Sequence, residues 1–135
     1  MVALTSSRNT LKRGRNLLVA PLAAATVIHL GALVALNAAG NAVPGSVSNA
    51  LKAAGRAQFT ANNAGGAAGA MKIEIERGVF RFVNHGADPV TQADVLSDCY
   101  IVDDQTVAKT HATNTRSRAG KVLEVDDGGV WVEIT

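Results

Sequence analysis

The residues that most often carry chemistry are few and scattered in this chain. The histidines His29, His85 and His111 lie far apart in the sequence, and none belongs to a metal-binding spacing such as His-Glu-x-x-His. We expect His85 and His111 to be solvated in polar loops, and His29 to be a partly buried, hydrogen-bonded side chain within an apolar run. Cys99 is the single cysteine. It stands beside a tyrosine in an apolar stretch and is predicted to be a small buried hydrophobe.

Two adjacent carboxylate pairs are the next candidates. Asp103-Asp104 and Asp126-Asp127 could bind calcium or act as acid and base. The first pair lacks the alternating oxygen ligands of an EF-hand loop, and the second lies in an expected hairpin turn. Both pairs therefore favour turn formation, because aspartate tolerates tight backbone angles and accepts hydrogen bonds from its own backbone.

A glycine-rich segment, residues 60–70, could cradle a phosphate. Its spacing is not that of a P-loop, and no Gly-Lys-Ser/Thr follows it. We interpret it as a flexible loop between strands. A Gly-x-Ser-x-Gly elbow is also missing from the sequence, and Cys99 has no histidine beside it. With no metal-binding spacing of the histidines either, we expect neither an enzyme nor a bound metal.

The elements around these residues are expected to be short strands. Residues 71–76 alternate apolar and charged side chains, which is typical of a half-buried strand, and residues 79–83 continue the extended pattern after Gly78. Residues 121–125 and 130–134 flank Asp-Asp-Gly-Gly and predict a hairpin. The sequence thus predicts a mainly β fold, a small β-barrel or β-sandwich with at most one short helix near residues 91–94.

Residues 17–36 form an uncharged apolar run whose interpretation stays open. Its length suits a membrane span, and the basic stretch before it suits a secretory signal. Pro21, His29 and the many alanines weaken both interpretations. We favour soluble strands separated near Gly31, followed by a turn at residues 37–41 and a short strand.

Charge is distributed very unevenly along the chain. Residues 1–73 contain seven Lys or Arg and no acidic residue, a net +7, whereas residues 74–135 contain six Lys or Arg and eleven acids, a net −5. Residues 1–16 show no apolar periodicity. We therefore divide the chain into an extended basic N-terminal arm, 1–16, and a single β domain, 17–135, and we expect the arm to bind an acidic surface.

Several stretches together resemble the small capsid decoration, or head cement, proteins of tailed bacteriophages, including those of Mu-like phages and prophages. These stretches are rich in turn glycines and strand patterns and are residues 31–45, 54–69, 78–84, 100–110 and 119–134. The resemblance implies a virion structural protein on the outside of an icosahedral capsid, made in the host cytoplasm. It implies the major capsid protein as partner and self-association as a homotrimer, with a dimer as the alternative. It also implies an adhesive role with no cofactor and no small-molecule substrate.

The basic arm supplies the residues that we expect to make contact. These are Arg8, Lys12, Arg13 and Arg15, on an acidic surface of the capsid or of a sister subunit. An alternative is a secreted or periplasmic β domain with a cleaved N-terminal leader. A nucleic-acid-binding tail is a weaker alternative, because no aromatic residue lies near the basic cluster, and we expect neither nucleic acid nor a membrane as partner.

Overall fold

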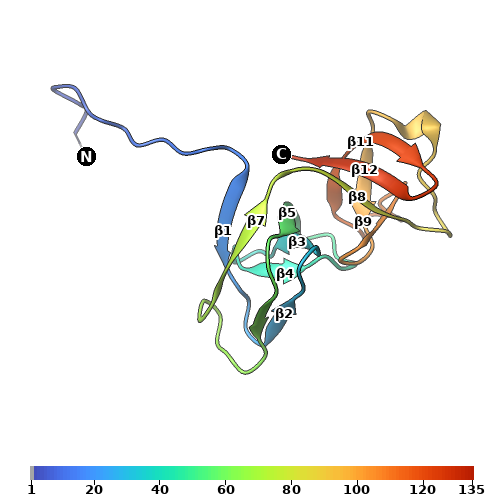
Figure 1. The fold of residues 1–135 in the computed structure, drawn as a ribbon, viewed down its shortest axis with the longest axis horizontal. Coiled ribbons are helices and arrows are strands. Elements are labelled where there is room, and N and C mark those ends of the chain that lie inside the picture. The colour runs from blue at the N-terminus through green and yellow to red at the C-terminus, as the bar shows by residue number, and fades with distance from the viewer. Residues whose placement is uncertain (1) are drawn as a thin grey trace.

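The computed structural model describes residues 2–135, and it is built almost entirely from β-strands (Figure 1). The N-terminal half forms a five-stranded sheet, and the C-terminal half forms a closed five-stranded barrel. The only helical element among residues 2–135 is the 3-10 turn η1 (Gln92–Asp94), which the Thr91 and Asp94 capping box begins. The mainly β fold class predicted from the sequence is confirmed, as is its extended N-terminal arm.

The five-stranded sheet is antiparallel throughout. Its strands, in spatial order, are β1 (Leu17–Pro21), β7 (Lys72–Glu76), β5 (Lys52–Ala57), β3 (Leu33–Leu36) and β4 (Ala42–Pro44). A parallel bridge between Leu22 and Ala42 brings the far end of β1 against β4. The predicted alternation of residues 71–76 is confirmed over β7, where Ile73 and Ile75 are buried and Lys72 and Glu74 are exposed.

The barrel closes through one parallel and four antiparallel pairings. Its strands, in order around the barrel, are β10 (Thr106–Ala108), β8 (Gly78–Asn84), β12 (Gly129–Ile134), β11 (Arg118–Asp126) and β9 (Asp98–Ile101). The predicted hairpin is the β11–β12 pair. The chain enters the barrel directly from β7, because a single residue, Arg77, separates β7 from β8.

Two short strands correct the sequence interpretation. β2 (Thr26–Ile28) and β6 (Ala61–Asn63) form a two-stranded sheet of their own. Residues 60–70 were therefore wrongly predicted to be loop throughout. Asn63 stabilises the turn that follows: its side-chain amide donates to the carbonyl oxygens of Ala23 and Ala67, each at 3.0 Å.

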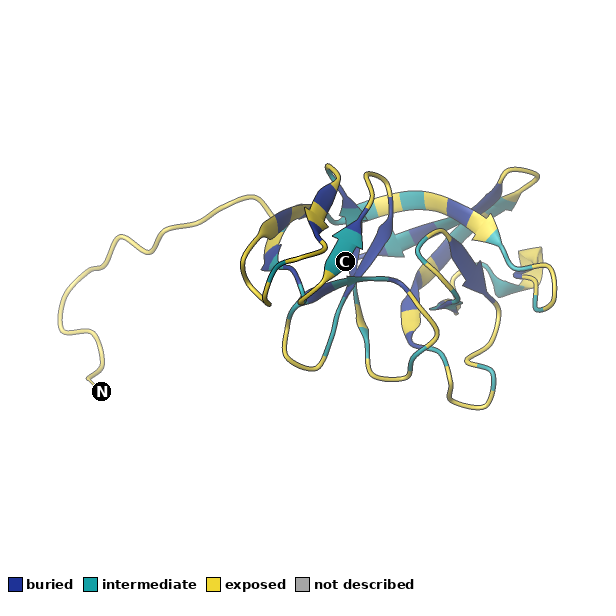
Figure 2. Cartoon of the chain, turned by 90° about the horizontal axis from the view of Figure 1, so that it is seen from below, coloured by how far each residue is buried: buried dark blue, intermediate teal, exposed yellow. Residues whose placement is uncertain are grey.

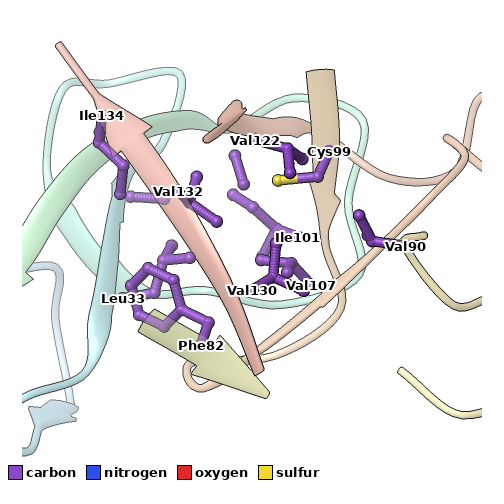
Figure 3. Close-up of a cluster of buried hydrophobic side chains, with 12 residues drawn as sticks. Leu33, Phe82, Val90, Cys99, Ile101, Val107, Val122, Val130, Val132 and Ile134 are labelled. Carbon is purple, nitrogen blue, oxygen red and sulfur yellow. The ribbon is translucent and has the colours of Figure 1, made fainter. Parts of the chain in front are cut away.

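Two hydrophobic cores lie on opposite sides of β3. The barrel core is drawn in Figure 3 and combines barrel residues such as Phe82, Ile101 and Val132 with Leu33 of β3. The second core, which includes Val34, lies within the N-terminal half. Because successive side chains of a strand point to opposite faces, β3 contributes to both cores and joins the two halves.

Candidate functional site

The apolar run that could have spanned a membrane is instead part of these cores. β1, β2 and β3 all arise from residues 17–36, and Leu22, Ile28 and Leu33 within that range are fully buried. No helix among residues 2–135 is long and apolar enough to cross a bilayer.

The N-terminal arm is the candidate functional site. Residues 2–16 belong to no strand or helix and are exposed, and the arm extends away from the rest of the molecule (Figure 2). The bonds that fix its path are few. Thr10 N–H donates to Arg8 O at 3.1 Å within the arm, and Arg77 N–H donates to Asn16 O at 2.7 Å where the arm joins the sheet.

All four predicted contact residues lie on this arm, and the fold does not engage their charges. The ion pairs among residues 2–135 are made by other side chains, so Arg8, Lys12, Arg13 and Arg15 have no carboxylate within bonding distance. At the base of the arm, a hollow of about 440 Å³ is lined by Arg15, Arg77 and Thr135, among other residues. The arrangement leaves a strip of free positive charge attached to a folded domain.

The strand that follows the arm is also incompletely covered. β1 lies at one end of the sheet order and pairs with β7 alone. Its side chains Leu17 and Val19 are 41% and 43% exposed, although both are large and apolar. Sequence reasoning assigned residues 17–36 to strands but had no signal for which strand would lie at the sheet edge.

The candidate chemical residues do not assemble into a site in the described part of the chain. No group of three or more His, Cys, Asp or Glu side chains within residues 2–135 could hold a metal ion. His29 is exposed, so its predicted partial burial is wrong: the chain turns at residues 30–31, and His29 points to solvent beyond the end of β2.

Burial explains the state of the lone thiol. Cys99 is completely buried in the barrel core, and this burial raises its pKa to about 12. Its Sγ lies 3.7 Å from the carbonyl oxygen of Gly120. The prediction of a buried small hydrophobe is confirmed, because a thiol with this pKa stays protonated at neutral pH.

The second carboxylate pair has a structural role in its turn. Asp126 accepts a hydrogen bond from the indole N–H of Trp131 at 3.0 Å and one from Gly128 N–H at 2.8 Å. The indole bond is the largest cause of the lowered pKa of Asp126. The Gly128 bond and the nearby Arg81 guanidinium lower this pKa further. In the first pair, Asp103 accepts from Gln105 N–H at 2.9 Å, which is the turn geometry expected from the sequence.

One further carboxylate organises a loop that the sequence did not single out. Asp88 accepts bonds from the Thr110 hydroxyl at 2.6 Å and from Arg116 Nη1 at 3.0 Å. The Thr110 hydroxyl bond is the largest cause of the lowered pKa of Asp88, and Arg116 adds to it. These partners are 22 and 28 residues away in sequence, so the sequence did not indicate that the three side chains would meet.

Comparison of the chain with protein-family models, with curated proteins and with solved structures finds no match.

Proposed function

We propose that this protein decorates the outside of an icosahedral bacteriophage capsid and braces neighbouring major capsid subunits. The observation that carries the proposal is the free basic arm: residues 2–16 leave the folded domain and present four cations that the fold does not pair. An unpatterned charged segment of this kind gains order when it binds a complementary surface.

The folded part suits an adhesive role. Its cores consist mainly of Val, Ile, Leu and Ala side chains packed between short strands. Such a domain presents a compact body, and attachment to neighbours would add to its stability by mass action. Individually the arm charges contribute little at a surface, and together they set orientation and association rate.

The buried apolar run favours the intact chain as the working form over a chain with a cleaved leader. Cleavage after residue 39, where small residues follow the run, would remove β1, β2 and β3. Both cores would then lose members, including Leu33 and Val34. Intact mass measurement of the protein recovered from its source tests this point directly: a mass beginning at Met1 or Val2 fits the proposal, and loss of residues through 39 supports a secreted domain.

Co-sedimentation with capsids assembled from the major capsid protein of the same phage or prophage tests the function itself. We expect the full chain to pellet with the shells. A chain lacking residues 2–16 should pellet much less while keeping its β-sheet circular dichroism. A matched variant with Arg8, Lys12, Arg13 and Arg15 changed to Gln separates charge from length. Equal pelleting of all three proteins would overturn the role of the arm, and absence of pelleting for the full chain would overturn the proposed function.

A further inference from the structure

The edge of the sheet at β1 is open over a short, defined length. β7 is the one strand that pairs with β1 among the described residues, and Figure 1 shows β1 on the outer side of β7. The opening ends where Leu22 bridges Ala42 and Ala23 N–H donates to Ala42 O at 3.1 Å. An incoming strand could therefore lie along Leu17–Ala20. The chain bends at Arg15 and Asn16, so the arm has to straighten there for such pairing to extend into residues 13–16.

The hydrogen-bond alternation of β1 shows which backbone groups face this opening. Arg77 N–H donates to Asn16 O at 2.7 Å, and Leu22 N–H donates to Met71 O at 2.9 Å. In an antiparallel pair, every second residue bonds to the partner strand. Even-numbered residues of β1 therefore bond to β7, and the N–H and C=O groups of Leu17 and Val19 point away from the sheet.

The sequence of β1 agrees with this alternation. Pro21 falls on an outward position, where the N–H that proline lacks has no partner to lose. Leu17 and Val19 combine outward backbone groups with exposed apolar side chains. An edge of this kind is a template for strand addition.

We propose that the occupant of this edge is a second copy of the chain, whose residues 13–19 pair antiparallel with residues 13–19 of the first about a two-fold axis at Asn16. In this register Arg15 of the partner subunit lies opposite Leu17. Arg13 of the partner subunit lies opposite Val19. The same pairs form again on the other side of the axis, as an isologous interface requires.

Charge complementarity selects this register. Residues directly opposite each other share a face of the sheet, and Leu17 and Val19 already lie opposite Glu76 and Glu74 of β7. Each incoming arginine is thus two strand spacings, about 10 Å, from a glutamate on the same face. A long arginine side chain can reach across the intervening apolar residue. Glu74 makes no ion pair within residues 2–135, so its carboxylate is available to pair with an incoming arginine.

The neighbouring registers are less favourable. Pairing Leu17 with Leu17 of the partner subunit would place an arginine opposite Pro21, next to the cation Lys72, at the point where Ala42 closes the edge. Pairing Arg15 with Arg15 of the partner subunit would place two like charges side by side, which destabilises a sheet. The two-fold pairing at Asn16 avoids both conflicts.

This inference does not depend on capsid binding, and it leaves residues 2–12 of each arm, with Arg8 and Lys12, free for another surface. It favours the dimer over the trimer that the sequence resemblance implied. Two identical antiparallel edge strands pair all of each other's free backbone N–H and C=O groups along the shared length, which leaves no edge there for a third copy.

A proline substitution tests the backbone pairing. Val19→Pro removes an outward N–H and leaves the bonds to β7 intact, whereas Val19→Ala shortens the side chain and keeps the N–H. Sedimentation equilibrium should show a monomer–dimer equilibrium for the natural chain, weakened about tenfold or more by Val19→Pro and less by Val19→Ala, because two intersubunit hydrogen bonds are lost. A monomeric natural chain at several hundred micromolar, or equal dimerisation of the two variants, would overturn the proposal.

A charge exchange keeps the proposal falsifiable if the proline variant does not fold. Arg13→Glu lies in the arm, outside the folded domain, and should weaken dimerisation, as should Glu74→Arg. Combining the two restores opposite charges across the interface and should recover the affinity of the natural chain to within a few-fold. Failure of the double variant to recover would contradict the register, while capsid pelleting of these variants is scored separately and reports on the proposed function.

Discussion

Leu33 and Val34 are neighbours on β3, yet their fully buried side chains lie in different hydrophobic cores. Leu33 packs with the barrel, and Val34 packs within the N-terminal half. The backbone reinforces this connection, because Leu33 N–H donates to Asp104 O in the β9–β10 turn at 2.7 Å. A single strand thus ties both halves into one structural unit.

The shared strand predicts one unfolding transition for both halves. Val34→Ala removes two buried carbons from the core of the N-terminal half, away from the barrel whose strand β12 carries Trp131, at a cost of about 2 kcal/mol. We expect the melting temperature to fall by roughly 5–10 °C. Trp131 fluorescence, which reports on the barrel, and far-ultraviolet circular dichroism should shift together. An unchanged tryptophan transition would show that the barrel melts on its own.

Gly55 is expected to be intolerant of any side chain. Its φ of +150° is one that other residues rarely adopt, and a Cβ there would overlap the carbonyl oxygen of Glu76 on β7. Gly55→Ala should lower the free energy of unfolding by about 3 kcal/mol. Gly86→Ala is the matched control, since nothing lies within 4 Å of a Cβ at that position. Urea denaturation measures both variants, and equal midpoints would refute the expectation.

Asp88 should make stability depend on pH in a defined direction. Its pKa is lower in the folded than in the unfolded chain, with the Thr110 hydroxyl bond as the main cause. The carboxylate therefore stabilises the fold above its unfolded pKa of about 3.9, and this contribution is lost as the pH falls through the folded pKa. Asp88→Asn should lower the melting temperature at about pH 7 and have little effect near pH 2. A difference of the same size at both pH values would argue against this ionic role.

The buried thiol gives a simple reactivity test. With its pKa raised to about 12, Cys99 should react with a thiol reagent only when the protein unfolds. Absorbance after addition of Ellman's reagent at about pH 8 measures this, with denatured protein as the reference. Rapid labelling of the folded protein would mean that the barrel core opens readily around β9.

Local patterns carried most of what could be predicted from the sequence. The Asp-Asp-Gly-Gly turn located the β11–β12 hairpin, in which the alternate residues Val130, Val132 and Ile134 are buried. Period-two alternation located β7 in the same way. In each case the signal lies within about ten residues, where strand periodicity and turn chemistry act directly.

The pairing of strands far apart in the sequence could not be predicted from such local patterns. The barrel closes where β10 runs parallel to β8, pairing Thr106 with Val83, and nothing in either three- to seven-residue segment specifies the other. β2 and β6 are too short to show a period. The open edge at β1 depends on where every other strand lies. The candidate contact residues of the arm were predicted from charge alone, because that signal is visible in composition and needs no fold.

Imaging of purified virions by electron cryomicroscopy tests the central claim most directly. We predict density for a strand-built domain of this size on the outer surface of the shell at equivalent lattice positions, with a thin extension matching residues 2–16 lying on an acidic patch of a neighbour. Shells with bare outer surfaces, with the protein recovered entirely from the soluble fraction, would contradict the account.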